Sequence, residues 1–339
     1  TVKNAAYGFL LKSEIAAGKI LDIDTKAAEK ADGVNAVITH KNALKLKYTR
    51  RVRGGAMLQD DSVRYFGENI GIIVAETFEQ ARYAAKLVKV KYQETEAKTN
   101  LNKLKNYAVQ AKSRKDSIKG DVEKAFSHAE IKLDEIYVTP IEHHHTMAPH
   151  ATIANWDGDD KLVVYNESQI VIGVQAAVAS AFGLERNNVR VITPHIGGGF
   201  GAKGGAWGHV AICVMAAKMI KRPVRLALNR QMMFNSVGLR QKNIQTIKLA
   251  ANKDGKLTAL AHETITHTPT DQEFIEPCGD VSMHMYETPN LRTSYKVAPM
   301  NILLPTYTRA PGKSTGSFAL ESAIDELAYK VKCAALFSV

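Results

Sequence analysis

A glycine-rich run stands between two apolar segments and reads Ile196-Gly197-Gly198-Gly199-Phe200-Gly201-Ala202-Lys203-Gly204-Gly205. The segment before it, residues 189–193, is β-branched as a strand is, and residues 206–220 are apolar enough to predict a buried helix. Glycines at such a strand-to-helix turn let backbone N–H groups approach a ligand without a Cβ in the way. The run therefore predicts an oxyanion-binding loop, although the glycines alone fit an ordinary tight turn equally well.

The loop lies in a stretch without acidic residues. From Arg186 through Lys253 there is no Asp or Glu, whereas Lys and Arg number twelve. Such a local excess of positive charge favours a phosphorylated ligand, with a basic solvated surface as the alternative. The whole chain carries 45 Lys and Arg against 34 Asp and Glu, a net charge of +11. The other basic run, residues 41–53, has only Tyr48 as an aromatic, so nucleic-acid binding is not expected.

Two phosphate-binding motifs can be compared with the loop. A P-loop is excluded because Gly204 follows Lys203 where Ser or Thr should bind magnesium. The dinucleotide fingerprint matches at Gly199, Gly201 and Gly204, but the ribose-binding acid expected about 20 residues later is absent. An NAD-type dehydrogenase remains an alternative.

The 339 residues, 45% of them hydrophobic, predict about two folded domains. Three scattered cysteines suggest neither a disulfide framework nor a Cys-rich zinc site, and no transmembrane helix is expected. Residues 94–119 are rich in Lys, Asn and Ser, as linkers are. Before them we expect mixed α/β structure with strands at 34–39, 70–75 and 87–92 and a helix that Thr77 and Gln80 cap. After them we expect helices at 121–129 and 174–182, strands at 131–139 and 224–228, and a hairpin of 151–156 and 161–166 turning at 157–160.

Three sequence words carry a resemblance to a known family. They are the glycine run at 197–203, Asn166-Glu167-Ser168-Gln169, and Thr308-Arg309-Ala310-Pro311-Gly312. Together they resemble the molybdenum-binding (large) subunit of the xanthine oxidase family, in its aldehyde oxidoreductase branch of the periplasmic type. Residues 78–82 and 319–328 support the resemblance. It implies an α+β chain: an α/β hammerhead domain at 1–100, a linker at 101–120, and the first half of a molybdopterin-binding domain at 121–339.

The resemblance assigns roles to individual residues. It implies that the Gln169 amide approaches an oxygen ligand of molybdenum, and that Gly198, Gly199, Phe200 and Gly201 form the cofactor loop, with the Phe200 and Gly201 N–H groups offered to the cofactor. It implies that Arg309 contacts the cofactor and acts catalytically, orienting a substrate carbonyl oxygen or stabilising developing negative charge. The metal itself is held through the pterin, so no protein ligand to it is expected.

Departures from the family pattern narrow the activity. Purine-oxidising relatives have Glu after the loop lysine, where this chain has Gly204, so an aldehyde is the expected substrate. Ala148 stands where the family usually has Glu. His143, His144, His145 and His150 suggest zinc, but adjacent histidines point in different directions and we expect no metal site there.

The resemblance also implies cofactors and partners. We expect molybdopterin, as its cytosine dinucleotide, with molybdenum; [2Fe–2S] clusters and FAD would reside on an iron–sulfur and an FAD subunit, because this chain has no cysteine cluster. The family's catalytic glutamate lies in a Gly-Val-Gly-Glu segment that has no match here, and the resemblance is expected to end after Lys330. A C-terminal half would then be a separate partner. Location would be cytoplasmic, or periplasmic through a partner's signal.

The sequence therefore predicts part of a molybdenum hydroxylase that oxidises aldehydes to carboxylic acids with water as oxygen donor and is inactive alone. A non-catalytic docking or assembly fragment for partner subunits is the alternative from another class.

Overall fold

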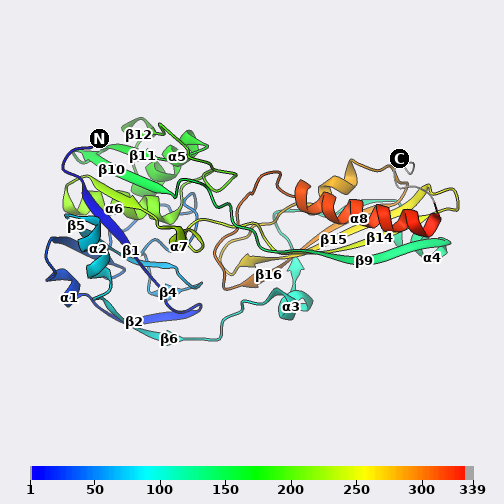
Figure 1. The fold of residues 1–339 in the computed structure, drawn as a ribbon, viewed down its shortest axis with the longest axis horizontal. Helices are drawn as coiled ribbons and strands as arrows, with labels where there is room; N and C mark the ends of the chain where they lie inside the picture. Colours follow the sequence, from blue (N-terminus) through cyan, green and yellow to red (C-terminus); the bar gives the residue numbers. More distant parts are fainter. Residues whose placement is uncertain (1, 333–339) are drawn as a thin grey trace. The chain divides into compact units, whose positions relative to one another are not determined.

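The computed structural model describes residues 2–332, which form two compact units. The first unit comprises the chain up to Ala97 together with His143–Leu239 and Asn301–Leu304. The second comprises Lys98–Glu142, Arg240–Met300 and the chain from Pro305 onward. Both units combine helices with sheets (Figure 1), so the predicted α+β class is confirmed.

A seven-stranded mixed sheet forms the frame of the first unit. In spatial order its strands are β12 (Val189–Ile192), β11 (Lys161–Asn166), β10 (Ala151–Asp157), β13 (Val224–Ala227), β1 (Ala6–Lys12), β5 (Asn69–Ala75) and β3 (Val34–Thr39). The parallel pairing of β1 with β13, with Ala6 opposite Val224, joins strands from both sides of the predicted linker. The expected hairpin of β10 and β11 is confirmed.

Helices pack on this sheet. They are α1 (Lys26–Glu29), α2 (Phe78–Ala85), α5 (Val171–Phe182), α6 (Gly208–Ile220) and α7 (Arg230–Met233), with a 3-10 turn η2 (Arg186–Asn188). Helix α6 contacts β10 and β13 and is buried through most of its length, as its apolar sequence predicts. The Thr77 and Gln80 side chains cap α2 reciprocally, which confirms the predicted capping box.

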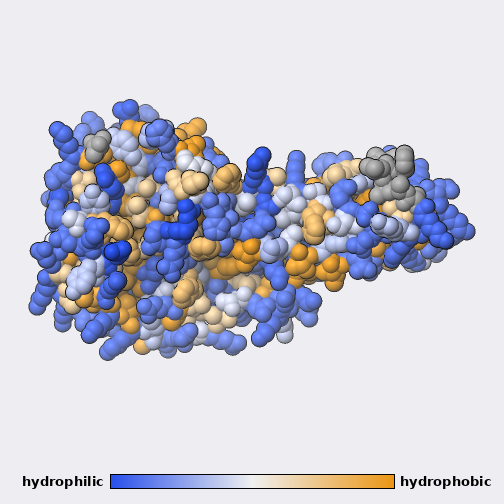
Figure 2. Space-filling model, viewed as in Figure 1, coloured by the Kyte–Doolittle hydropathy of each residue, from blue (hydrophilic) through white to orange (hydrophobic). Residues whose placement is uncertain are grey.

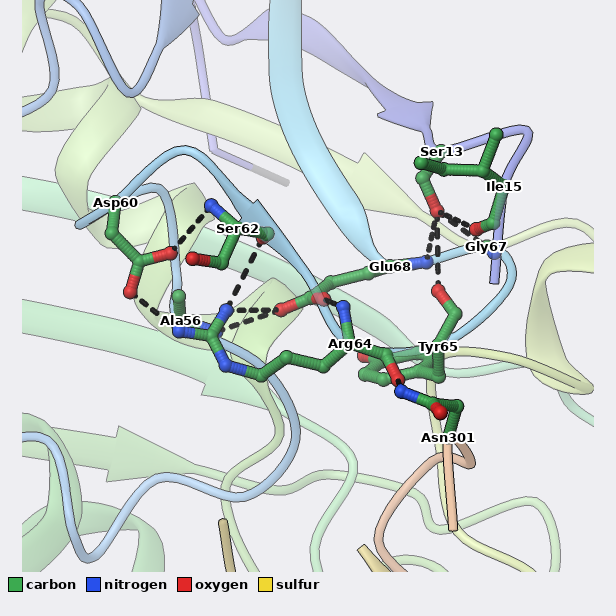
Figure 3. A network of polar contacts seen from close by, with 10 residues as sticks. All are labelled: Ser13, Ile15, Ala56, Asp60, Ser62, Arg64, Tyr65, Gly67, Glu68 and Asn301. Atoms are coloured by element: carbon green, nitrogen blue, oxygen red, sulfur yellow. Dashed lines mark hydrogen bonds and ion pairs between the residues drawn. The ribbon is translucent and has the colours of Figure 1, made fainter. Parts of the chain in front are cut away.

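A small sheet of β4 (Ser62–Val63), β2 (Gly18–Asp24) and β6 (Lys89–Glu94) completes the unit. Beside it lies the polar network of Figure 3, centred on the buried carboxylate of Glu68. That carboxylate accepts hydrogen bonds from the N–H groups of Ala56 (3.1 Å) and Arg64 (2.7 Å), and pairs with the Arg64 guanidinium at 3.3 Å. These bonds hold a turn in which Met57 and Leu58 adopt left-handed φ angles, which non-glycine residues adopt only when the surroundings enforce it.

The second unit is a six-stranded sheet covered on one face by a long helix. Its strands are β7 (Val109–Gln110), β16 (Leu291–Met300), β15 (Leu257–Pro269), β14 (Asn243–Ala251) and β9 (Ile131–Thr139), with β8 (Ser117–Lys119) also paired to β16. Its helices are α3 (Leu101–Leu104), α4 (Val122–His128) and α8 (Lys313–Val331), with 3-10 turns η1 (Lys105–Tyr107) and η3 (Cys278–Met283). Helix α8 packs on β9 and β14.

Residues 101–120, expected as a linker, contribute α3, η1, β7 and β8. These elements are two to four residues long. Elements this short leave no periodic pattern in the sequence. The strands β7 and β8 are held in place by their pairing with β16.

The chain has a mostly hydrophilic surface, as its content of charged residues predicts. Within residues 2–332 no helix combines the length and apolarity that crossing a bilayer requires. Figure 2 shows hydrophilic side chains over most of the face in view, with smaller hydrophobic patches between them. Cys213 and Cys278 are buried free thiols, and Cys333 lies outside the described residues.

Candidate functional site

The glycine-rich run forms an irregular loop between β12 and α6, as predicted. Its backbone turns through left-handed φ angles at Gly197 (65°), Gly198 (89°), Phe200 (53°) and Gly201 (105°). Glycine adopts these angles readily, but phenylalanine does so only at a cost of order 1–3 kcal/mol. The surroundings of the loop must therefore enforce the conformation of Phe200, whose side chain is half exposed.

Several consecutive backbone N–H groups of this loop are unpaired within the described part of the chain. The N–H groups of Gly198, Gly199 and Phe200 have no hydrogen-bond acceptor among residues 2–332. The Gly201 N–H, by contrast, donates to Gln169 Oε1 at 2.9 Å. Of the two N–H groups that the resemblance assigns to the cofactor, only that of Phe200 is therefore unpaired here. Consecutive unpaired N–H groups suit an anionic oxygen.

Gln169 follows β11 and lies against the loop. Its backbone N–H donates to the Lys203 carbonyl at 2.8 Å. A Cβ on Gly199 would lie 2.5 Å from Gln169 Cδ, so the missing side chain of Gly199 makes room for the amide. Gln169 Oε1 is occupied by Gly201, whereas Nε2 has no acceptor within residues 2–332 and remains a free donor.

Lys203 is buried and fully paired. Its Nζ donates to the carbonyls of Ile196 (2.6 Å) and Ala148 (3.0 Å) and pairs with Glu167 Oε2 at 2.6 Å. The three donors of the ammonium are thereby used, so Lys203 is not available to a phosphate.

Ion pairs reduce, but do not remove, the excess of positive charge that the sequence predicts for this stretch. Acids from distant parts of the sequence pair with half of the twelve cations: Lys203 with Glu167, Lys218 with Asp159, Arg222 with Glu76, Arg240 with Glu142, Lys248 with Asp134 and Lys253 with Glu130. A stretch without acids in sequence is therefore not without acids in space.

The segment from Thr146 to Ala148 borders the loop. Arg230 donates to the carbonyls of Thr146 (2.6 Å) and Met147 (2.9 Å), and the Ala148 N–H donates to the Gly197 carbonyl at 3.0 Å. A Cβ on Gly197 would lie 2.3 Å from Ala148 Cβ. The small side chain at 148 therefore packs directly against the glycine run.

In the described part of the chain, the neighbouring histidines belong to no group of three or more His, Cys, Asp or Glu side chains that could hold a metal ion. The rings of His143 and His145 pack against Phe234 in tilted and edge-on arrangements, with ring centroids 4.7 and 5.0 Å away. His150 is buried against His209 at 5.7 Å, and burial lowers the pKa of His150 to about 3, with the nearby Lys203 charge acting in the same direction.

Arg309 belongs to the second unit. Its guanidinium is exposed and makes no hydrogen bond or ion pair within residues 2–332, whereas its carbonyl accepts a hydrogen bond from Arg240 Nη2 at 2.7 Å. Arg240 is buried, donates to the Ser314 hydroxyl and lies 3.7 Å from Glu276 Oε1. Glu276, whose pKa is raised by burial, accepts the Gly312 N–H at 2.8 Å. A buried ion pair thus holds the loop that presents Arg309.

The structure brings Gln169, Gly198, Gly199, Phe200 and Gly201 together in the first unit and places Arg309 in the second. Sequence reasoning missed four supporting residues, Glu167, Lys203, Arg240 and Glu276. Glu167 and Lys203 lie within the motif words and could have been suspected. Arg240 and Glu276 lie far from any motif, and no pattern indicates their pairing.

Comparison with known proteins adds the family. Residues 103–336 match the family model of the molybdopterin cofactor-binding domain. Residues 1–96 match that of the a/b hammerhead domain of aldehyde oxidase and xanthine dehydrogenase. The chain belongs to the molybdopterin-binding proteins of this family. The match extends beyond Lys330, where the resemblance was expected to end.

Curated relatives of the chain include aldehyde oxidases and oxidoreductases. The chain is 37% identical over 333 residues to the aldehyde oxidoreductase molybdenum-binding subunit PaoC of Escherichia coli (strain K12), covering 96% of this chain and 44% of that protein. It is 30% identical over 316 residues to aldehyde oxidase 4 of Arabidopsis thaliana, covering 88% of this chain and 24% of that protein. It therefore spans less than half the length of these curated relatives.

Solved structures share the fold. The aldehyde oxidoreductase of Desulfovibrio gigas superposes with a TM-score of 0.85 at 23% identity, over 98% of this chain and 39% of that one. Quinoline 2-oxidoreductase of Pseudomonas putida 86 superposes with a TM-score of 0.89 at 20% identity, over 100% of this chain and 46% of that one.

Proposed function

We propose that this chain is part of the molybdenum-binding subunit of a molybdenum hydroxylase that oxidises aldehydes to carboxylic acids with water as oxygen donor. The observation that carries the proposal is the row of unpaired N–H groups at Gly198, Gly199 and Phe200, in a loop of the matched molybdopterin-binding family. These groups and the free Gln169 Nε2 are donors of the kind that the anionic oxygens of a molybdenum cofactor require.

Each site residue then has a role. Phe200 and its neighbours would donate backbone hydrogen bonds to the cofactor, and Gln169 would donate through Nε2. Gly201 would keep the Gln169 amide in place through its own N–H. Arg309, with its guanidinium free, would orient the substrate's carbonyl oxygen and stabilise negative charge that develops on it. When bound, the cofactor would supply transfer of two electrons and of an oxygen atom drawn from water.

The domain assignment and partners belong to the same proposal. Residues 1–100 would be the hammerhead domain, 101–120 a linker and 121–339 the first half of the molybdopterin-binding domain. The cofactor would be the cytosine dinucleotide form. Electrons would leave through [2Fe–2S] and FAD subunits, and the protein would act in the cytoplasm, or in the periplasm through a partner's signal.

Two alternatives differ in their support. An NAD site is disfavoured because α6 begins at Gly208, after the glycine run rather than within it. Docking of partner subunits has one observation in its favour: exposed apolar side chains at Met147, Ile170 and Ile172 flank the loop segments. A clean monomer by light scattering contradicts docking between copies of the chain through these residues.

Turnover by the complex that the chain forms with its partner subunits, purified from its own host, tests the activity. The assay measures reduction of an artificial electron acceptor with a panel of aldehydes and with purines, after growth with molybdate or with tungstate. We expect turnover with aldehydes, little with purines, and loss of turnover after growth on tungstate. Aldehyde oxidation that survives tungstate, or that requires added NAD, contradicts the proposal.

A further inference from the structure

The Lys203 ammonium is the single point at which three segments of the candidate site meet. Glu167 stands two residues before Gln169, Ile196 begins the glycine run, and Ala148 packs on Gly197. The Nζ atom contacts all three, at 2.6, 2.6 and 3.0 Å. The Lys203 side chain is fully buried, whereas that of Glu167 is 24% exposed.

Backbone hydrogen bonds connect the same segments. The Gln169 N–H donates to the Lys203 carbonyl at 2.8 Å, and the Ala148 N–H donates to the Gly197 carbonyl at 3.0 Å. The Gly201 N–H, in turn, donates to Gln169 Oε1 at 2.9 Å. A shift of Lys203 would therefore be felt at Gln169 directly and at Gly201 through it.

Because the Lys203 ammonium is buried, losing its contacts would cost the loop stability. A buried ammonium is stable only when acceptors surround it, and its removal would leave two carbonyls and a carboxylate without their donor. The carbonyls of Ile196 and Ala148 flank the run in which Phe200 is held at a φ of 53°. The ammonium thus supplies the local attraction that an energetically unfavourable loop conformation requires.

We propose that Lys203, through its ion pair with Glu167, is a positioning residue for the cofactor loop, ordering the Gly201 and Gln169 amides and the unpaired N–H groups before them. This inference rests on the proposed function for the identity of the ligand, but not for the ordering of the loop. It assigns the loop lysine to the protein's own backbone and not to a phosphate.

Amide hydrogen exchange in the protein as isolated from its host tests the ordering. The variants are Lys203→Met and Glu167→Gln, and the matched control is Lys218→Met. Lys218 also pairs with an acid, Asp159, at 2.8 Å, but near the other end of α6. We expect exchange at Gly201 and Gln169 to accelerate about tenfold in both test variants, which corresponds to the loss of one hydrogen bond, and to stay unchanged in the control.

If Lys203→Met does not fold, the exchange rates in Glu167→Gln decide the test, because the partly exposed Glu167 side chain tolerates the substitution. Two further measurements separate positioning from general stability. Molybdenum content is expected to fall about tenfold in both test variants. The paramagnetic resonance signature of the metal that stays bound is expected to shift in both and to remain unchanged in Lys218→Met. Unchanged exchange at both amides in Glu167→Gln overturns the inference. A wild-type protein without molybdenum overturns the proposed function instead, while the exchange comparison still decides the role of Lys203.

Discussion

At the scale of single residues, the missing side chain of Gly199 matters as much to the site as the Gln169 amide that occupies its space. The Gln169 amide occupies the space where a Cβ on Gly199 would lie, 2.5 Å from its Cδ. A glycine at this position is therefore required by a neighbour and not by its own backbone angle. The glycine run thus combines two kinds of glycine, those at left-handed angles and one that makes room for the site.

Gly199→Ala should have the same effect on cofactor binding as Gln169→Ala, because it displaces the Gln169 amide. The new methyl group would push the end of a flexible side chain away, at a folding cost below about 1 kcal/mol, and break the bond from Gly201 to Oε1. We expect the purified protein to lose cofactor as Gln169→Ala does, with the thermal unfolding midpoint nearly unchanged.

Gly173→Ala is the control, since that glycine lies within α5 and a Cβ there would meet only Ile170. Alanine favours a helix interior by about 1 kcal/mol relative to glycine, so this variant should keep its cofactor and be no less stable. Full cofactor content in Gly199→Ala contradicts the role given to the amide.

Arg309→Ala should separate activity from stability. Because the exposed guanidinium makes no hydrogen bond or ion pair with any residue that the structure describes, its removal should change the free energy of unfolding by no more than about 0.5 kcal/mol. In the complete enzyme we expect turnover of aldehydes to fall by about 100-fold or more, as loss of a charge-stabilising donor does. Unfolding curves and steady-state kinetics on one preparation check both, and wild-type turnover in the variant refutes a catalytic role for Arg309.

At the scale of elements, the sequence indicates those that carry their own pattern. The buried helix α6, the capping box of α2 and the turn between β10 and β11 follow from periodicity, from Thr77 with Gln80, and from Asp157 with Gly158. The glycine run and the Asn166–Gln169 motif also predict where Phe200 and Gln169 lie in the sequence of elements. What sequence reasoning misses is pairing at long range: the parallel contact of β1 with β13, the short strands on β16, and the acids that pair with half of the cations in the basic stretch.

Strands β14 and β15 enclose a histidine that should make the second unit sensitive to acid. His262 is fully buried between Ser282 Oγ (2.8 Å from Nδ1) and Gln245 Oε1 (3.0 Å from Nε2). Burial lowers its pKa from 6.5 to about 3. The unfolded chain therefore takes up a proton first as the pH falls, so stability is complete above about pH 6.5 and is lost progressively down to about pH 3.

The expected loss is about 1.4 kcal/mol for each pH unit below 6.5. Urea unfolding between pH 7 and pH 5 measures it. His262→Gln, which cannot titrate, should lower stability at pH 7 but show a shallower pH dependence. An unchanged slope in that variant would mean that His262 does not contribute to the acid sensitivity.

The loop of Arg309 depends on the buried pair of Arg240 with Glu276. Arg240→Met would leave the Glu276 carboxylate without its cationic partner and the Arg309 carbonyl without its donor, at a cost of about 3–5 kcal/mol. We expect a lower midpoint in urea for the second unit. The double variant Arg240→Met with Glu276→Gln should recover part of the loss, since no buried charge is then left unpaired; Glu142, the other partner of Arg240, is half exposed. Equal losses in the single and double variants argue against the pairing.

At the scale of the whole molecule, the chain contains the glycine loop and the arginine for which we propose cofactor and substrate roles, but no match to the Gly-Val-Gly-Glu segment that the resemblance implies. It also spans 44% of the length of PaoC. The 339-residue polypeptide on its own should therefore show no aldehyde oxidation, because the base that the family uses is not within it. Added aldehyde and an artificial acceptor provide the assay, and measurable turnover by this polypeptide alone contradicts the proposal that it is one part of a larger subunit.

The most direct measurement is of molybdenum and pterin nucleotide in the protein purified from its own host. If the loop around Phe200 binds the cofactor, both are present in amounts equal to the chain, and both are lost in Gln169→Ala. Protein that is folded and assembled with its partners but carries neither molybdenum nor a pterin contradicts the account.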